Sequence, residues 1–326
     1  MRRRMKKIVF TLGFVSALGA ANAQQMQQLS QYLMNPYLIN PAAAGLTDYV
    51  DLNLSYRAQW VGFDNAPRTY YLSGNSVIGR ISDAPRYSAS LRTSKAAAPK
   101  NTGIRTGKMR HAVGGNLMTD SYGPFKRNMA NASYAIHLPI TKNMNIAVGV
   151  GMGISNIVFD QNKVDLLNPN DATYSTFLGS SDKKNLFDVF TGIYLYTNQW
   201  QVGYSNAQMM QNKLYFGDPT NAALKMHHFF SAGYSIQAND NFIITPNLLL
   251  KYMNPAPAAL DINCKFEYKE VMYGGISYRH KDAVVGMIGM LWNNIKIGYS
   301  YDYTISTLRK QNSGGHEIIA GYKIKI

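Results

Sequence analysis

Cysteine and glutamate are scarce in this chain of 326 residues. A single cysteine, Cys264, excludes an internal disulfide framework and a cysteine-based zinc site. Only three of the 18 acidic residues are glutamates (Glu267, Glu270 and Glu317), and glutamate is among the residues that favour helices. A mostly helical fold is therefore disfavoured, whereas 23 tyrosines and 27 glycines favour strands and turns.

Charge is also sparse, and most of it has one sign. Charged residues make up 16% of the chain, compared with roughly 25% in an average soluble domain, and the net charge is +15. No run of 18 consecutive apolar residues occurs after the N-terminus, so the sequence predicts no transmembrane helix. Hydrophobic residues still make up 46%, which excludes disorder as the main state.

The first 23 residues have the three parts of a secretory signal. Five cations stand between residues 2 and 7, an apolar stretch runs from Ile8 to Ala20, and Ala21-Asn22-Ala23 is a small-x-small cleavage site. No cysteine follows this site, so a lipoprotein is not expected. We expect a signal peptide over residues 1–23, Sec-type export, and a mature chain with a net charge of 28 − 18 = +10.

The mature chain alternates between apolar and small or polar residues with a period of two. The pattern is clearest in residues 144–155, 229–238 and 295–305, and these runs are long enough to cross a membrane as tilted strands. Short turns at 197–198, 239–241 and 292–294 favour antiparallel neighbours, whereas longer polar stretches occur at 82–108, 160–184, 207–223 and 307–315. The sequence therefore predicts an all-β fold, a transmembrane antiparallel β-barrel of about 14 strands over residues 47–326. A soluble all-β sandwich is the alternative, although its strands would be about half as long.

Residues 24–46 differ from the rest of the chain. They are rich in Gln and Asn and are interrupted by Pro36 and Pro41, which prevent a long helix. Large apolar residues such as Leu33 and Tyr37 argue against the alternative of a disordered leader. We expect a short helical or coil segment packed at or in the barrel lumen.

Four separated motifs carry a family resemblance. They are MNPYLINPAAAG (34–45), YRAQWVGFDNAPRTYYLSG (56–74), TDSYGPFKRNMANASYAIHLPI (119–140) and the C-terminal YSYDYTISTLRKQNSGGHEIIAGYKIKI (299–326). In this order they resemble the PorP/SprF family of type IX secretion system membrane proteins, over nearly the whole mature chain. The family-motif positions are Asn35, Pro36, Asn40, Pro41, Gly45, Gly123, Pro124, Phe125, Tyr301, Asp302, Tyr303, His316 and Glu317.

The resemblance implies an outer-membrane component of the type IX secretion machinery. Related proteins are required for secretion of cargo with C-terminal sorting domains and, in gliding bacteria, for surface display of adhesins. The partners implied are periplasmic components, namely a peptidoglycan-binding protein and a ring complex with a lipoprotein, or the sorting-domain cargo. Outer-membrane lipid surrounds such a barrel.

One motif suggests specific contacts. We interpret Arg57 and Asp64 as a candidate ion pair shielded by Trp60 and Phe63. The pair would fix the first hairpin or contact a partner, because aromatic and arginine side chains often anchor interfaces. Alternatively, Trp60 belongs to the interfacial aromatic belt and Phe63–Pro67 is a rigid turn. The candidate residues are Arg57, Gln59, Trp60, Phe63, Asp64 and Pro67.

Other chemistry has little support. His227 and His228 point to opposite faces of a strand, and no two histidines have a spacing recognised for metal sites. No G-x-S-x-G motif occurs, and the glycines at 149, 151 and 153 alternate as on a packed strand. We expect no enzyme activity, no cofactor, no metal and no nucleic-acid partner. Asp302, Glu317 and Lys296 fall on the polar phase of their strands, where lumen charges pair with one another.

Two function classes remain. The first is a scaffold that links periplasmic machinery to the outer membrane or anchors exported cargo. The second is a passive pore for small solutes, which predicts an open polar lumen. The connection at 82–108 bears on the first class, because an N-terminus in the periplasm places it on the periplasmic side, where turns are usually short. Either the strand count is wrong there or this loop is a docking element.

Overall fold

The computed structural model describes residues 28–79, 104, 106–164, 183–213 and 223–325. Strands dominate these residues and follow the period-two pattern. Among these residues, helical structure is confined to five short 3-10 turns: η1 Tyr32–Met34, η2 Pro36–Leu38, η3 Pro41–Ala43, η4 Gln161–Lys163 and η5 Thr307–Gln311. None of the described helices is long and apolar enough to span a bilayer. The predicted signal peptide lies outside the described residues.

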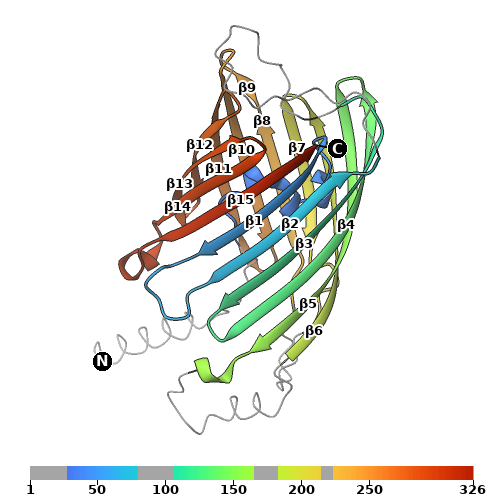
Figure 1. The fold of residues 1–326 in the computed structure, drawn as a ribbon. Helices are drawn as coiled ribbons and strands as arrows, with labels where there is room; N and C mark the ends of the chain where they lie inside the picture. Colours follow the sequence, from blue (N-terminus) through green and yellow to red (C-terminus); the bar gives the residue numbers. More distant parts are fainter. Residues whose placement is uncertain (1–27, 80–103, 105, 165–182, 214–222, 326) are drawn as a thin grey trace, which may run out of the picture.

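Each strand pairs antiparallel with its neighbour, and the last pairs with the first (Figure 1). β8 and β9 both pair with β10 and form one interrupted strand, so the fifteen labelled strands make a closed 14-stranded barrel. This confirms the predicted fold and strand count. The strands are β1 Tyr49–Ala58, β2 Arg68–Val77, β3 Arg110–Tyr122, β4 Phe125–Thr141, β5 Met144–Phe159, β6 Lys183–Thr197, β7 Trp200–Ala207, β8 His227–Tyr234, β9 Ile236–Gln237, β10 Phe242–Met253, β11 Ala256–Tyr268, β12 Met272–Arg279, β13 Ala283–Trp292, β14 Ile295–Thr304 and β15 Gly315–Lys325.

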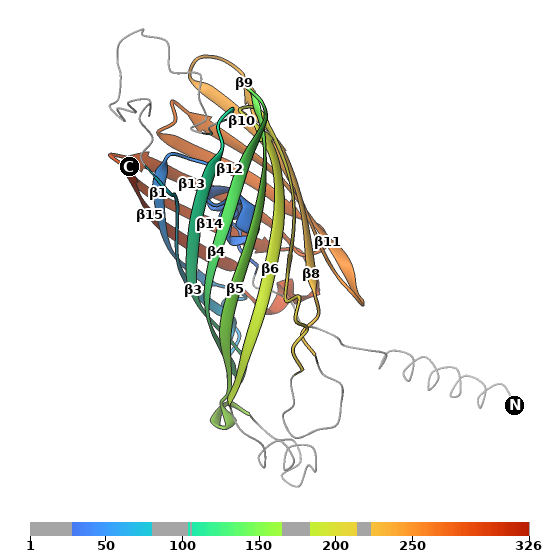
Figure 2. The same cartoon turned by 90° about the vertical axis from the view of Figure 1, so that its right-hand side faces the viewer.

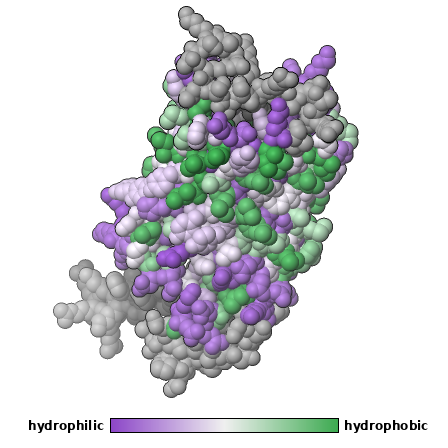
Figure 3. All heavy atoms as spheres, in the orientation of Figure 1, coloured by the Kyte–Doolittle hydropathy of each residue, from purple (hydrophilic) through white to green (hydrophobic). Residues whose placement is uncertain are grey.

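The two faces of the wall differ as the alternation predicts. In β5 the odd positions from 145 to 159 are buried, whereas Val148, Met152 and Ile154 point outward and are 44%, 59% and 64% exposed. In β14 the outward side chains are isoleucines and tyrosines, whereas Lys296, Ser300 and Asp302 are buried inside. Figure 3 shows the outward hydrophobic side chains as a band, with hydrophilic side chains gathered toward the lower end.

The two ends of the barrel carry different connections. The long-loop end joins β5 to β6 (160–182), β7 to β8 (208–226) and β14 to β15 (305–314). The short-turn end holds the C-terminus and the turns at 142–143, 198–199, 269–271 and 293–294. The connection between β2 and β3 (78–109) also belongs to the short-turn end, because β2 ends and β3 begins there. The strand count is therefore correct at this loop.

Candidate functional site

The N-terminal segment, residues 28–48, lies inside the barrel (Figures 1 and 2). It contains three 3-10 turns, η1 Tyr32–Met34, η2 Pro36–Leu38 and η3 Pro41–Ala43. A proline is the first residue of η2 and of η3, where its missing N–H is tolerated and its fixed φ suits a helical turn. The prolines thus divide the segment into short turns that fold across the lumen.

Asn40 joins η3 to the wall. Its side-chain oxygen accepts from Ala42 N at 2.9 Å, which caps η3, and its amide nitrogen donates to Ile193 O at 3.1 Å and Tyr204 O at 3.2 Å. A Cβ at Gly149 would lie 2.5 Å from Pro41 C and 2.7 Å from Ala42 Cα. The glycine on the inner face of β5 therefore provides the space in which η3 packs.

The flanking motif residues are also bound to the wall. Asn35 donates to Ser73 Oγ at 2.8 Å, and the Gly45 backbone N–H donates to Asn75 Oδ1 at 3.0 Å. Gly45 has a φ of +70°, which favours glycine, and a Cβ there would overlap Ala112 Cβ. The family-motif positions between 35 and 45 thus form the part of the chain that fills the lumen.

A buried ionic cluster holds the start of the segment. Arg57 Nη2 lies 2.6 Å from Asp302 Oδ2, and Arg57 Nη1 lies 3.2 Å from Glu317 Oε2. Ser30 lies between them: its backbone N–H donates to Glu317 Oε2 at 2.6 Å, and its hydroxyl donates to Asp302 Oδ1 at 2.7 Å. Arg57 and Glu317 are 1% and 0% exposed, so their charges depend on these partners rather than on water.

The cluster continues across β10 to β12 and the turn that follows β12. Arg279 Nη1 lies 3.3 Å from Asp302 Oδ2 and 3.2 Å from Asp282 Oδ2, and it donates to Gln28 Oε1 at 2.9 Å. Lys251 Nζ lies 2.7 Å from Asp261 Oδ2. The three cations and four carboxylates nearly neutralise one another, so this is a structural network and not a conduit lined by one sign of charge. The expectation that lumen charges pair is confirmed here.

The end of the segment has its own anchors. Arg110 Nη1 lies 3.2 Å from Asp48 Oδ1 at the short-turn end. His137 is fully buried between Ala44 O, 2.7 Å from its Nε2, and the Tyr196 hydroxyl, 2.8 Å from its Nδ1. Residues 28–48 therefore run from the long-loop end to the short-turn end and are fixed at both.

The sequence predicts Arg57 as a candidate, but its predicted partner is wrong. The structure pairs Arg57 with Asp302 and Glu317, whereas Asp64 lies exposed in the β1–β2 connection. Gln59 also contacts Arg57: with its amide oxygen turned toward the guanidinium, that oxygen accepts from Nε at 3.2 Å. The ion pairs of Arg57 lie inside the lumen, because its side chain points inward from β1. Residues 59–67, which include Asp64, belong to the β1–β2 connection and not to a strand.

The remaining candidates form a fixed loop at the long-loop end. Gln59 N donates to Pro67 O at 2.9 Å, which closes the connection. Trp60 has a φ of +49°, and Val61 N donates to Gly314 O at 2.9 Å, so this loop is bonded to the β14–β15 loop. Phe63 is 36% exposed beyond these bonds. The backbone is thus held while the tip faces outward.

The other family-motif residues lie in strands of the barrel wall or in the turn between β3 and β4. Gly123 and Pro124 make the β3–β4 turn, in which Gly123 has a φ of +54°. The Phe125 ring lies 5.3 Å from the Phe159 ring. Tyr301 and Tyr303 point outward, and the His316 ring lies 5.2 Å from the Tyr301 ring. These residues shape the hairpins and the outer surface.

Sequence reasoning missed Ser30, Arg279 and the Asp48–Arg110 pair. The alternation of β12 could have identified Arg279 as a lumen residue, because it continues the inward positions of Tyr273, Gly275 and Ser277. No local pattern in the sequence identifies Ser30, since its partners are 272 and 287 residues away.

The site offers charged and hydrogen-bonding groups that hold the lumen segment. Within the described residues, no group of three or more His, Cys, Asp or Glu side chains could hold a metal ion. A cavity of about 90 Å³ remains between the segment and β3–β8, with Tyr37, Arg127 and Asp188 in its lining. The contacts between residues 28–48 and the strands can hold this segment in the lumen and so close it.

Comparisons with known proteins agree with the barrel. The sequence profile of the family described as "Type IX secretion system membrane protein PorP/SprF" matches residues 21–322. A search of curated proteins gave no match. Similar solved structures include the TodX deltaS2S3 mutant monoaromatic hydrocarbon channel, at 10% identity and a TM-score of 0.51 over 90% of this chain and 94% of that one. The Pseudomonas putida toluene transporter TodX is 9% identical, with a TM-score of 0.50 over 90% of this chain and 94% of that one. The Acinetobacter baumannii outer membrane protein Omp33 is 9% identical, with a TM-score of 0.45 over 86% of this chain and 99% of that one.

Proposed function

The chain belongs to the PorP/SprF family of type IX secretion system membrane proteins, and from this membership we propose that it is a closed scaffold of that system in the outer membrane. It would link periplasmic machinery to the outer membrane or anchor exported cargo. The chemistry of secretion would then belong to other components, and this protein would act by binding and not as an enzyme.

The occupied lumen is the observation that carries the proposal. The segment is bonded to β15, β2, β6 and β3 through Ser30, Asn35, Asn40, Gly45 and Asp48. A passive pore needs a continuous polar path, and a buried network of neutralised charges opposes the entry of ions. This supports a scaffold over the alternative of a small-solute pore.

Each end of the barrel offers a surface for one kind of partner. At the short-turn end, the last part of the 78–109 connection is fixed: Ile104 pairs with Thr47 and packs against the buried apolar cluster that contains Ala42, and Gly107 N donates to Asn145 Oδ1 at 2.7 Å. Residues 80–103 are outside the described residues. In an outer-membrane barrel this end faces the periplasm, where the peptidoglycan-binding protein and the ring lipoprotein complex would dock.

The long-loop end would face outward and receive sorting-domain cargo. The loop 59–67, bonded to the β14–β15 loop, presents Val61 and Phe63, each 36% exposed, on a fixed backbone. Exposed apolar side chains on a pre-ordered loop bind with little loss of conformational entropy. This face would support adhesin display in a gliding bacterium.

In-cell crosslinking tests the proposal. An affinity-tagged protein, crosslinked and purified from membranes, is expected to bring periplasmic type IX components or a sorting-domain cargo with it. A variant lacking residues 84–102, which spares Ile104, should lose the periplasmic components and keep a folded barrel. The purified wild type should give no steady conductance in planar bilayers. Absence of any partner together with a stable open conductance would instead support the pore.

The direction of the chain through the lumen gives a second prediction. Gln28 contacts Arg279 at the long-loop end, so Gln28→Cys in a Cys264→Ser background should react on intact cells with a membrane-impermeant maleimide. Lys310→Cys, in the β14–β15 loop, should react equally, whereas Asn294→Cys at the short-turn end should react only after the outer membrane is permeabilised. Labelling of the Gln28 variant only after permeabilisation would contradict this path.

A further inference from the structure

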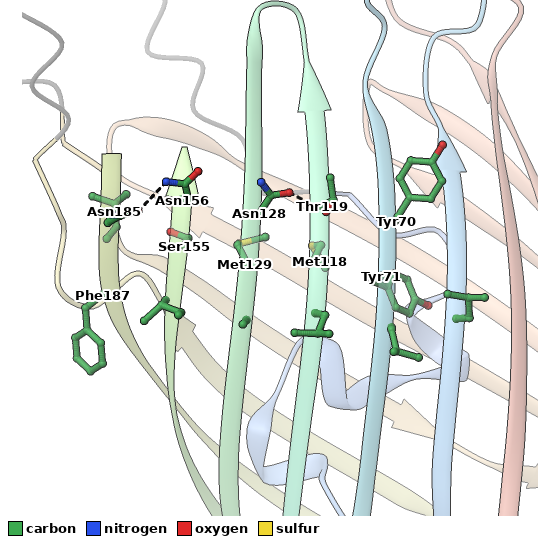
Figure 4. Close-up of a pocket in the computed structure, with 16 residues that line it drawn as sticks. Tyr70, Tyr71, Met118, Thr119, Asn128, Met129, Ser155, Asn156, Asn185 and Phe187 are labelled. Carbon is green, nitrogen blue, oxygen red and sulfur yellow. Dashed lines mark hydrogen bonds between the residues drawn. The ribbon is translucent and has the colours of Figure 1, made fainter. Parts of the chain in front are cut away.

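The outer face of β1–β6 contains an apolar groove of about 880 Å³ (Figure 4). Its floor is one cross-strand row near the long-loop end, in which a small residue lies between larger ones. The pairing register places in this row Leu54, Leu72, Leu117, Ala130, Ile154 and Phe187. The groove is hollow at the centre of the row because Ala130 has a small side chain. Ile154 and Phe187, which follow Ala130 in the row, are 64% and 47% exposed. The groove has the shape and polarity to receive a hydrocarbon chain.

The next row toward the long-loop end is polar. It contains Tyr70, Thr119, Asn128, Asn156 and Asn185, paired across the same strands. Figure 4 shows these side chains above the groove, where Thr119 Oγ1 donates to Asn128 Oδ1 at 2.9 Å and Asn156 donates to Asn185 Oδ1 at 2.7 Å. These bonds leave the amide nitrogens of Asn128 and Asn185 without an acceptor among the described residues. They are available to donate to a ligand.

A third row, still closer to the long-loop end, is cationic. Arg68, Ser121, Lys126, Val158 and Lys183 are cross-strand neighbours, and the three cations of the row are exposed. The outward positions of β2 to β6, as far as the structure describes them, carry no carboxylate. The face is therefore complementary to an anion.

We propose that this face binds a phosphate-bearing, multiply acylated glycolipid of the outer leaflet. Successive rows on one face of a strand are about 6.6 Å apart, so cations, amides and the apolar groove follow one another over about 13 Å. Phosphate, sugar amide and acyl chain follow in the same order in such a lipid. The cations pair with the phosphate, the amide row donates to acyl carbonyl and hydroxyl groups, and one acyl chain lies over Ala130.

The position of the rows in the membrane supports this occupant over a protein partner. β4 has 17 residues, whereas roughly 9–11 tilted residues cross a bilayer. The end of β4 that carries Asn128 and Lys126 therefore reaches the headgroup level of the outer leaflet, and Ala130 begins the hydrocarbon level. A protein surface would not need the charged, polar and apolar groups in this depth order.

Lipid binding by native mass spectrometry tests the proposal with the full mature protein in detergent. The probes are bisphosphorylated lipid A, the same glycolipid after removal of its phosphates, and phosphatidylglycerol. Wild type should retain the bisphosphorylated lipid about tenfold more strongly than either other probe. The triple variant Arg68→Gln, Lys126→Gln, Lys183→Gln should lose this preference, whereas Ala130→Trp should weaken binding of both glycolipids because it fills the groove.

The matched control removes three exposed cations at the same end of the barrel, in connections between other strands. Lys225→Gln, Lys281→Gln, Lys310→Gln has the same net charge as the first triple variant and should bind as wild type does. Heat-modifiable gel mobility reports folding of every variant. Equal loss in both triple variants, or equal retention of phosphorylated and dephosphorylated lipid by the wild type, would overturn the proposal. So would a wild type that binds no lipid but forms dimers that Ala130→Trp disrupts.

Discussion

Replacing Arg57 with methionine is expected to lower the free energy of unfolding of the barrel by about 3–5 kcal/mol. Arg57 is 1% exposed and holds Asp302 and Glu317, which are 4% and 0% exposed. Removal of the guanidinium leaves Glu317 without its cation, and Asp302 keeps only Arg279. Ser30 also loses a bond from Arg57, so the start of the lumen segment should be held less firmly.

Urea unfolding in detergent, followed by the mobility difference between folded and unfolded barrel, measures this effect. Arg68→Met is the matched control, because Arg68 lies on the adjacent strand but is exposed; it should change stability by less than about 0.5 kcal/mol. Adding Glu317→Gln to Arg57→Met should recover part of the loss, since the unpaired charge is then removed. A single Arg57→Met variant as stable as Arg68→Met would show that the cluster is not important for stability.

Gly149→Val is expected to turn a closed barrel into a conducting one. The added Cβ would lie 2.5 Å from Pro41 C and 2.7 Å from Ala42 Cα, and backbone atoms cannot move aside by changing rotamer. Overpacking of this kind costs about 1–3 kcal/mol, and η3 can relieve it by leaving the wall and breaking the Asn40 bonds. Planar-bilayer conductance should rise at least about tenfold above the wild-type baseline, by the exponential relation between free energy and population.

Gly286→Val is the control for this experiment. Gly286 is on the outward face of β13, and a Cβ there meets no atom within 4 Å. This variant adds the same side chain to the same kind of strand but should remain closed. If Gly149→Val also stays closed while the barrel is folded, residues 28–48 would not be what blocks the lumen, and the proposed scaffold would lose its main support.

The architecture was largely predictable from the sequence, because alternation is a local property. The period-two pattern of 144–155 and 295–305 places each side chain inside or outside before any partner strand is known. The prolines of 24–46 likewise predict a short helical or coil segment, and its apolar residues predict packing against the barrel. The strand count required only that these runs and turns be found along the chain.

The site was predictable only in part. The sequence predicts Arg57 as a candidate with Asp64, seven positions along the chain, as its partner, whereas Asp302 and Glu317 are 245 and 260 residues away. Closure of the barrel through β15 and β1 brings them together, and no local pattern encodes that contact. The rows of the outer groove depend in the same way on the register of six strands.

The sequence by itself thus determined which side chains face the lumen, which face lipid, and that residues before the first strand would pack against the barrel. The tertiary structure decided which lumen charges neutralise one another, how the N-terminal segment fills the interior, and which outward residues form continuous rows. The physical reason is the range of the interactions. Side-chain alternation follows from the geometry of one strand, whereas ion pairs and cross-strand rows require the closed barrel and its register.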